Sequence, residues 1–223
     1  MTGRFKDRYG VKLLKWHLYK RFTKAGRWHT QFAFERAVRA LQPGDVAIDC
    51  GANLGVYSII MARTGATVHA FEPDPQTFER LRANVREYPN VICHQCAVGD
   101  RSGDVEFYRA ADYNSDPEHF SLSSSVFADK VNISTAHAIS VPQIDLIAFV
   151  EGTTANVKLT KIDVEGAEVP LIEAMIERGK LSLFGEIFVE THETKIPGLA
   201  ERTARLRAFS ETPDGQMLHL DWD

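Results

Sequence analysis

The sequence predicts an α/β protein with a doubly wound, mostly parallel sheet and helices on both of its faces. An apolar run at residues 46–50 ends in a glycine-containing turn, and an apolar helical segment follows at 56–62. Further apolar runs at 67–72, 91–96 and 157–164 are separated mostly by segments long enough to hold helices. Strands that alternate with helices of about 10 to 15 residues are typical of βαβ units, which build parallel sheets.

Composition narrows the class of protein. The 223 residues are 44% hydrophobic and 25% charged, which is ordinary for a globular domain that forms a core without disulfides. Residues 1–30 hold nine Lys or Arg and one acid, whereas the remaining 193 residues carry a net charge of −12. Three cysteines are too few for a disulfide framework, and we find no apolar run of membrane-spanning length and no signal peptide. We therefore expect a cytoplasmic protein.

Two helices are predicted ahead of the first strand. From Tyr9 to about Thr23, apolar residues recur at helical spacing and the basic residues lie mostly off that stripe, which indicates an amphipathic basic helix. This pattern favours a lid or packing helix with a solvated outer face; contact with a membrane surface or an acidic partner is the alternative. A second helix is expected from about Trp28 to Leu41, before the turn at Pro43 and Gly44.

The stretch Val46–Gly55 predicts a strand that turns into a helix around a ligand. Gly51 and Gly55 let the backbone turn sharply and approach a ligand closely, and the start of the helix presents unpaired N–H groups. The dinucleotide-binding fingerprint requires glycines at the first, third and sixth positions of such a loop, but Asn53 and Val56 occupy the last two. The loop thus fits a cofactor without a pyrophosphate better than it fits NAD.

A second strand is expected at Thr67–Glu72, with an acid at its carboxyl end, 21 residues after Gly51. A carboxylate in this place accepts hydrogen bonds from both hydroxyls of a ribose. A ribose site without a diphosphate site suggests S-adenosylmethionine as the cofactor.

Three blocks of the sequence resemble the FkbM-type methyltransferases, within the class I S-adenosylmethionine-dependent group. The blocks are Asp49–Gly55, Phe71–Pro73 and Lys161–Glu168, and the resemblance runs from about Gly44 to Glu190. It implies a Rossmann-like sheet of about seven strands and O-methylation of a hydroxyl on a small molecule or sugar. It divides the chain into an N-terminal helical lid or extension, residues 1–43, and a class I methyltransferase domain, residues 44–223. A nucleic-acid substrate is disfavoured, because the basic charge is confined to one helix of an otherwise acidic chain.

A helix at Pro75–Glu87 is predicted to lead into a third strand at Val91–Cys96. The two cysteines of this strand are three residues apart, so they point to opposite faces and are expected to be buried and inert rather than metal ligands. The resemblance implies that Ala97 and Val98, which follow this strand, border the adenine of the cofactor.

Residues 101–140 have the least regular pattern, although 105–110 fits a strand. The serine cluster at 121–125 has loop composition. The resemblance implies that a serine-rich segment in this place lies near the cofactor, so Ser124 and Ser125 are expected contacts. We expect this insertion to determine which acceptor is bound, because variable loops on a rigid sheet carry specificity.

Acids follow the next core strand. Ser140–Leu146 reads as a strand that enters a short helix, and Val157–Val164 as the fourth core strand, with Asp163 at its carboxyl end and Glu165 just beyond. Unpaired buried charge is costly, so two acids at the ligand-binding edge favour a functional role. Glu168 is expected to cap the following helix, where an acid suits the helix dipole.

The fifth strand, Leu183–Glu190, brings further titratable groups to the same edge. They are either a polar strand end facing water or the source of a general base. Histidine titrates near neutral pH, and a neighbouring carboxylate can orient it. We predict His192 as the base that takes the proton of the acceptor hydroxyl, and name Asp163, Glu165 and Glu190 as further catalytic candidates. A last helix at 196–209 and a last strand at 217–222 complete the chain.

The predicted cofactor site has ten residues. They are Asp49, Gly51, Asn53, Gly55, Glu72, Pro73, Ala97, Val98, Ser124 and Asp163. No residue is assigned to a metal; a metal-dependent O-methyltransferase, in which Asp163, Glu190 or Glu193 holds a divalent ion, is the competing hypothesis for the mechanism. The sequence also leaves open an NAD-dependent oxidoreductase, and a methyltransferase-like module that binds a nucleotide or a partner without catalysis.

Overall fold

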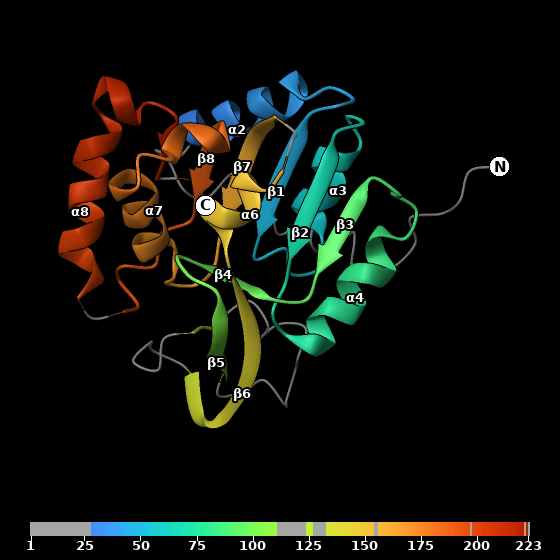
Figure 1. Cartoon of the computed structure of the whole chain (residues 1–223), viewed down its shortest axis with the longest axis vertical. Coiled ribbons are helices and arrows are strands. Elements are labelled where there is room, and N and C mark those ends of the chain that lie inside the picture. Colours follow the sequence, from blue (N-terminus) through green and yellow to red (C-terminus); the bar gives the residue numbers. More distant parts are fainter. Residues whose placement is uncertain are drawn as a thin grey trace.

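The computed structural model describes residues 28–110, 124–126, 133–153, 156–196, 198–220 and 222. Its main sheet has the strand order β3-β2-β1-β7-β8-β9, and all neighbouring strands are parallel (Figure 1). The strands are β1 (Val46–Cys50), β2 (Thr67–Phe71), β3 (Val91–His94), β7 (Val157–Ile162), β8 (Glu186–Val189) and β9 (Leu218–His219). The strand order reverses between β1 and β7, so ligands are expected at the carboxyl ends of these two strands.

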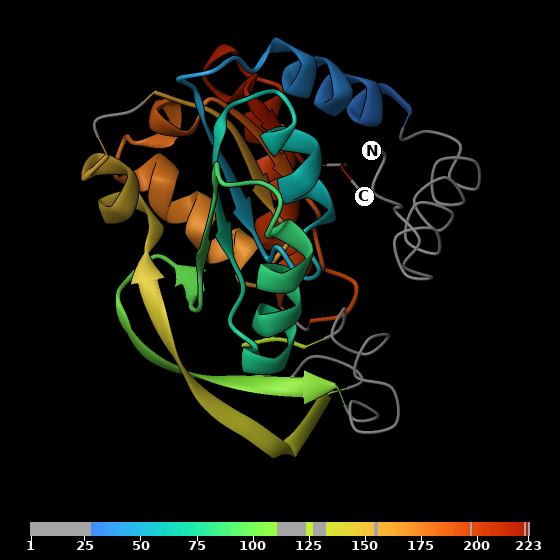
Figure 2. The same ribbon diagram turned by 90° about the vertical axis from the view of Figure 1, so that its right-hand side faces the viewer.

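Helices cover both faces of the main sheet, as the sequence predicts. They are α2 (Trp28–Ala40), α3 (Val56–Ala62), α4 (Pro75–Val85), α6 (Leu146–Glu151), α7 (Glu168–Glu177) and α8 (Leu199–Ser210). Alternate residues of β1 serve the two layers: Val46 and Ile48 pack in the core that contains α6, α7 and α8, whereas Ala47 packs with α2 and α3. Figure 2 shows α6 and α7 on one side of the sheet and α2, α3 and α4 on the other. The doubly wound fold is therefore confirmed.

Helix α2 is part of this core. Phe34 is buried, and its ring lies 5.2 Å from that of Phe188 in β8 and 5.1 Å from that of Trp222. The helix lies at the end of the main sheet away from the second, smaller sheet (Figures 1 and 2). The basic helix expected over Tyr9–Thr23 lies outside the described residues. Among the residues that are described, no helix is both long and apolar enough to cross a membrane.

A second sheet of three strands lies beyond the carboxyl ends of β1, β2 and β3 (Figure 1). Its strands are β4 (Ala97–Gly99), β5 (Gly103–Ala110) and β6 (Ile133–Asp145). β6 pairs in parallel with β4 and antiparallel with β5. The strand expected at Val91–Cys96 is shorter than predicted, because it ends at His94 and the chain crosses to the second sheet. This crossing brings Ala97 and Val98 to the ligand edge.

The cysteines follow the expectation of inert thiols. Cys96 packs in the core with α6 and α7, whereas Cys93 packs against the cluster that contains α4, so the two point apart. Burial raises the pKa of both thiols, that of Cys96 to about 11, so both are protonated at neutral pH. Among the described residues all three cysteines are free.

The C-terminal edge differs from the pattern that the resemblance implies. β9 has two residues and pairs in parallel with β8 through Ile187 and Leu218. The described residues form no terminal hairpin, and the main sheet has six strands where about seven were expected. Only residues 211–217 separate α8 from β9, which is too short for a further strand and a turn.

Gly51 lets the loops after β1 and β7 touch. Its φ is +74°, and a Cβ added there would lie 1.8 Å from the carbonyl oxygen of Asp163. The Asp163 N–H donates a hydrogen bond to the Cys50 carbonyl at 3.0 Å, which holds the two loops at this spacing. A side chain at position 51 would push apart the strands between which the site forms.

We expect Gly51→Ala to be far more destabilising than Gly44→Ala. Both glycines have positive φ, so both variants incur backbone strain of about 1–2 kcal/mol, but Gly44 has open space around it. Gly51→Ala adds a clash with backbone and should lower the free energy of unfolding by at least about 2 kcal/mol more. Urea unfolding of the two variants measures this difference. Equal losses would show that the approach of Gly51 to Asp163 is not a constraint.

Candidate active site

The loop between β1 and α3 is held by Glu72, which follows β2. Glu72 Oε2 accepts the Asn53 N–H at 3.0 Å, and Oε1 accepts the Asp74 N–H at 2.9 Å. Asn53 has a positive φ of 49°, a conformation that asparagine tolerates better than most residues. Each carboxylate oxygen has a second lone pair. Glu72 can therefore hold the loop and still accept two more hydrogen bonds from a ligand.

Glu72 has an unusual proton affinity. Burial raises its pKa to about 7, against the lowering effect of the hydrogen bonds from Asp74 and Asn53. A buried carboxylate with spare lone pairs gains from new donors, because the water it lost on folding is then replaced. Two ribose hydroxyls fit this requirement.

A pocket lies at the carboxyl ends of β1, β2 and β7, and it opens to solvent. Eight of the ten residues expected to bind the cofactor line it: Gly51, Asn53, Glu72, Pro73, Ala97, Val98, Ser124 and Asp163. Phe71, Phe107 and Val126 add apolar surface. The pocket combines an apolar slot with a few acids, which suits an adenosine with a charged tail.

Asp49 and Gly55, which are also expected to bind the cofactor, are not among the described residues that line the pocket, and their contact with the cofactor stays a prediction. Gly55 has φ +84°, and a Cβ there would lie 2.7 Å from Leu81, so it packs α3 against α4. Asp49 is fully buried; Ser58 Oγ donates to its Oδ2 at 2.6 Å, and Lys161 Nζ lies 3.2 Å from its Oδ1.

Lys161 is a buried charge beside the pocket for which the sequence patterns predicted no role. It is 2% exposed and sits in the central strand β7, where its Nζ donates to the Gly51 carbonyl at 2.7 Å and lies 3.5 Å from Asp163 Oδ2. Burial alone lowers the pKa of Lys161, but the charges of Asp49 and Asp163 outweigh burial and raise it above its usual value. A lysine among the buried positions of a central strand was the signal, because such a charge needs a buried partner.

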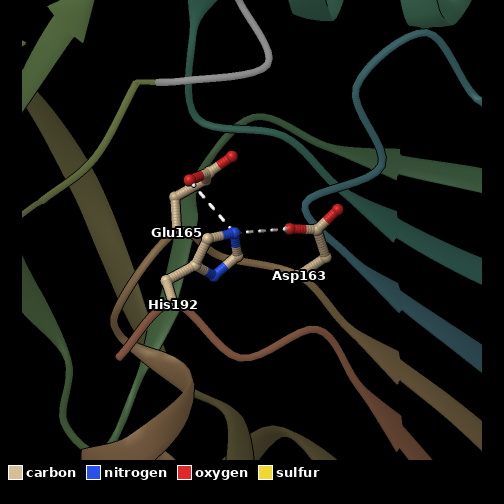
Figure 3. A group of neighbouring side chains, drawn as sticks. All are labelled: Asp163, Glu165 and His192. Carbon is tan, nitrogen blue, oxygen red and sulfur yellow. Dashed lines mark ion pairs between the residues drawn. The ribbon is translucent and has the colours of Figure 1, made fainter. Parts of the chain in front are cut away.

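Three side chains converge beside the pocket: Asp163, Glu165 and His192 (Figure 3). Asp163 and Glu165 follow β7 and line the pocket, and His192 follows β8 and is 1% exposed. His192 Nε2 lies 3.2 Å from Glu165 Oε2 and 3.9 Å from Asp163 Oδ1. The four predicted catalytic residues are thus neighbours, since Glu190 Oε1 also lies 3.9 Å from this nitrogen.

Glu168 orients His192 from the other side. Glu168 Oε1 accepts a hydrogen bond from the backbone N–H of His192 at 3.0 Å and lies 3.2 Å from the ring nitrogen Nδ1 of the same residue. Glu168 Oε2 accepts a hydrogen bond from the backbone N–H of Gly166 at 2.7 Å. The expectation that Glu168 simply caps α7 is therefore too narrow: the acid lies in the first turn, but it also holds the histidine. A carboxylate on Nδ1 leaves Nε2 to act toward the pocket.

The backbone at Glu165 is strained. Its φ is +55°, which is uncommon for a residue other than glycine and costs about 1 kcal/mol or more. Ser125 Oγ donates to the Glu165 carbonyl at 2.6 Å and helps to hold this conformation. Of the two serines expected near the cofactor, Ser124 lines the pocket and Ser125 instead braces Glu165.

Charge around His192 determines its protonation. Burial alone lowers its pKa, but the hydrogen bond with Glu168 and the charges of Glu165, Glu168 and Asp163 outweigh burial and raise the pKa to about 9. His192 therefore carries a proton at neutral pH in the free protein. The prediction of a histidine that titrates near neutral pH needs this correction.

Glu193 is not part of the group. Its Oε1 lies 2.8 Å from Arg207 NH1 in α8, and its pKa is lowered by hydrogen bonds with Thr191 and Arg207, against the effect of burial. The hypothesis in which Glu193 holds a metal is therefore not supported, since its carboxylate is already paired with an arginine.

Residues 49–212 match the family model of the methyltransferase FkbM domain. The chain belongs to the FkbM methyltransferase family. The match covers well over half of the chain and includes every residue predicted for the site. The resemblance read from the three sequence blocks is thereby confirmed.

Curated relatives of the FkbM family carry different substrate names. This chain is 48% identical to the 31-O-demethyl-FK506 methyltransferase FkbM of Streptomyces tacrolimicus over 66 residues, which are 28% of this chain and 25% of that protein. It is 30% identical to the hexuronic acid methyltransferase AglP of Haloferax volcanii over 150 residues, 66% and 56% of the two chains. It is 28% identical to the 2-O-methyltransferase NoeI of Sinorhizobium fredii over 159 residues, 67% and 63%. The match spans less than two thirds of each relative's length.

Removing the Lys161 charge should destabilise the protein strongly. Lys161→Met leaves Asp49 buried with only Ser58 as a partner, and breaking a buried ion pair in this way costs about 3–5 kcal/mol. The double variant Asp49→Asn with Lys161→Met should lose less than Lys161→Met alone. Urea unfolding of both variants is the measurement. A Lys161→Met variant as stable as the wild type would contradict a structural role for this pair.

Proposed function

We propose that this chain is an S-adenosylmethionine-dependent methyltransferase that methylates a hydroxyl of a sugar or another small molecule. The observation that carries this proposal is that buried Glu72 lines the same pocket as Asp163 and Glu165, the two acids beside His192. S-adenosylmethionine supplies a methyl group that its sulfonium has already activated. The protein then needs to hold the cofactor, align the acceptor and take one proton.

The cofactor would lie along the carboxyl ends of β1 and β2. Glu72 would accept hydrogen bonds from the ribose, and the left-handed backbone at Gly51 and Asn53 would leave room for the methionine part. Phe71, Ala97 and Val98 offer apolar surface for the adenine. This assignment is supported by the pocket lining and by the unusual pKa of Glu72.

The acceptor hydroxyl would meet Asp163, Glu165, Glu190 and His192. These residues would orient it and take its proton, as the sequence predicts. In the free protein the surrounding carboxylates hold a proton on His192 at neutral pH, so His192 has no lone pair to offer at Nε2. It releases that proton more readily when another positive charge shares the same carboxylates. The binding of a positively charged ligand in the pocket would therefore change the protonation of His192.

The names of the relatives support a hydroxylated acceptor. One names a hexuronic acid and another a 2-O-methyl transfer, and both fit carbohydrate chemistry. An NAD-dependent oxidoreductase is disfavoured, because the loop after β1 lacks two of the three glycines that a pyrophosphate needs. A binding module without catalysis is the competing hypothesis. The membrane contact expected for the basic N-terminal helix stays a prediction.

Calorimetric titration tests the cofactor first. We expect S-adenosylmethionine and S-adenosylhomocysteine to bind and NAD not to bind. Glu72→Ala should abolish or strongly weaken binding, because two ribose hydroxyls lose their acceptor. Failure of a folded wild-type protein to bind either adenosyl compound would overturn the enzyme proposal and favour the binding module.

Binding should also depend on pH through Glu72. The ionised carboxylate is the form that accepts two hydroxyls, so affinity should be full above pH 7 and fall as the pH drops below about 7, by roughly tenfold per pH unit. S-adenosylhomocysteine is the suitable probe, because its uncharged sulfur perturbs His192 little. Glu72→Gln should bind S-adenosylhomocysteine weakly. Its affinity should not change between about pH 6 and 8, the range in which Glu72 of the wild type titrates.

Proton removal is tested with an acceptor found by screening hydroxylated sugars. His192→Gln should lower kcat by about 10²–10⁴-fold while S-adenosylhomocysteine binds within a few-fold of wild type, because His192 lies outside the pocket lining. Glu193→Gln is the matched control. Glu193 directly follows His192 in the chain, but its carboxylate pairs with Arg207. Equal kcat in both variants would remove His192 from the catalytic group.

A further inference from the structure

We propose that Asp163, Glu165 and His192 bind one divalent cation of the Mg²⁺ or Mn²⁺ class, and that the acceptor oxygen binds to this cation. The cation site stands on the contacts of these three residues alone. The statement about the acceptor rests on the proposed function.

The spacing of the three side chains fits a single ion. Each offers one ligand atom, and these atoms all lie within 4.8 Å of one another (Figure 3). Metal–ligand bonds of about 2.0–2.2 Å place two ligands of one ion about 2.8–4.4 Å apart. The distances from His192 Nε2 to Glu165 and Asp163, 3.2 and 3.9 Å, fall in this range.

His192 is the second, independent indication of a ligand. Its side chain is 1% exposed, its Nε2 makes no hydrogen bond among the described atoms, and the nitrogen is aimed between the two acids. The 3.2 Å approach to Glu165 is thus an ion pair without hydrogen-bond geometry. A buried ring nitrogen of this kind lacks a partner that a metal ion would supply.

Glu168 completes the arrangement that metal-binding histidines commonly have. A carboxylate that accepts from one ring nitrogen fixes the tautomer and orients the other nitrogen toward the ion. Glu168 Oε1 lies 3.2 Å from His192 Nδ1 and is fully buried. Its partner Gly166 N–H keeps it in place at 2.7 Å.

The charge balance points the same way. Four carboxylates have an oxygen within 3.9 Å of a His192 ring nitrogen, namely Asp163, Glu165, Glu168 and Glu190. Among the described residues, the cations near them are Lys161, which also neutralises Asp49, and Lys195, which is half exposed and 3.9 Å from Glu165. A divalent ion would add positive charge beside these partly buried carboxylates.

The donor set favours oxygen-loving ions. A set of two carboxylates and one imidazole suits Mn²⁺ and Mg²⁺. Structural zinc sites, by contrast, are rich in sulfur ligands. Asp163 and Glu165 line the pocket, so an ion between them faces the ligand space. Mg²⁺ and Mn²⁺ take six ligands, which leaves positions for one or two acceptor oxygens. A hydroxyl beside a second oxygen, as in a sugar diol or a hydroxy acid, would chelate it.

The cation divides the roles within the catalytic group. It lowers the pKa of the hydroxyl that it binds. His192 would release its Nε2 proton to solvent as the cation binds and would then be a ligand, and Glu190 would take the proton of that hydroxyl. The oxygen forms a bond to the methyl carbon as the carbon–sulfur bond breaks, which leaves S-adenosylhomocysteine and the methyl ether. No other reactant is required.

The test is a titration of chelator-treated protein with Mn²⁺. Binding is measured as the loss of the free Mn²⁺ signal in electron paramagnetic resonance. We expect one Mn²⁺ per chain, displaced by excess Mg²⁺. Glu165→Gln and His192→Gln should each weaken binding at least tenfold, and Glu168→Gln by about 10–100-fold. Glu193→Gln should bind as the wild type does. If His192→Gln does not fold, Glu165→Gln still tests the site. The Glu165 side chain is 14% exposed, so its substitution perturbs the core less than that of His192, which is 1% exposed.

Titration of the same samples with S-adenosylhomocysteine separates the two proposals. If S-adenosylhomocysteine binds and Mn²⁺ does not, or if Glu165→Gln and Glu193→Gln bind Mn²⁺ equally, the cation site is overturned and the proposed function stands. If Mn²⁺ binds with the expected variant pattern and neither adenosyl compound binds, the cation site is supported and the proposed function fails.

Discussion

The buried ion pair between Lys161 and Asp49 is the interaction on which the rest of the site depends. The two residues are register partners in β7 and β1, the strands between which the sheet order reverses. From this place Lys161 Nζ also binds the carbonyls of Cys50 and Gly51 and approaches Asp163. One buried ammonium therefore sets the path of the loop after β1 and the position of the first acid after β7. Its own burial is tolerable only because both acids are present.

The second sheet forms one wall of the pocket at the carboxyl-end edge of the main sheet. Ion pairs and hydrogen bonds hold the second sheet in this place. Arg109 in β5 pairs with Asp74 at 2.7 Å, and Asp74 also caps α4 through the N–H groups of Gln76 and Thr77. On the other side, Ser125 holds the Glu165 carbonyl. Ala97 and Val98, from the first strand of this sheet, form part of the wall. Asp145, at the end of β6, adds an ion pair with Arg178 at 2.8 Å.

Acids outnumber bases in the pocket, and this imbalance defines what the site can hold. Glu72 is buried with a raised pKa, and His192 keeps its proton because four carboxylates surround it. Each group gains when a ligand brings donors or positive charge. The proposed cationic cofactor and the proposed divalent ion would both meet this need.

Local sequence patterns determined the order of strands and helices and the acids at the strand ends. Apolar runs, glycines and turn residues report on neighbours in the chain, and they sufficed to predict β1, β2 and β7 and to name eight residues that line the pocket. Tertiary structure alone decided that Lys161 pairs with Asp49, that Glu168 holds His192 and that Glu193 turns to Arg207. It also decided that Ala97 lies in a second sheet. These outcomes depend on strand register and on loops meeting across distant parts of the chain, which no local pattern encodes.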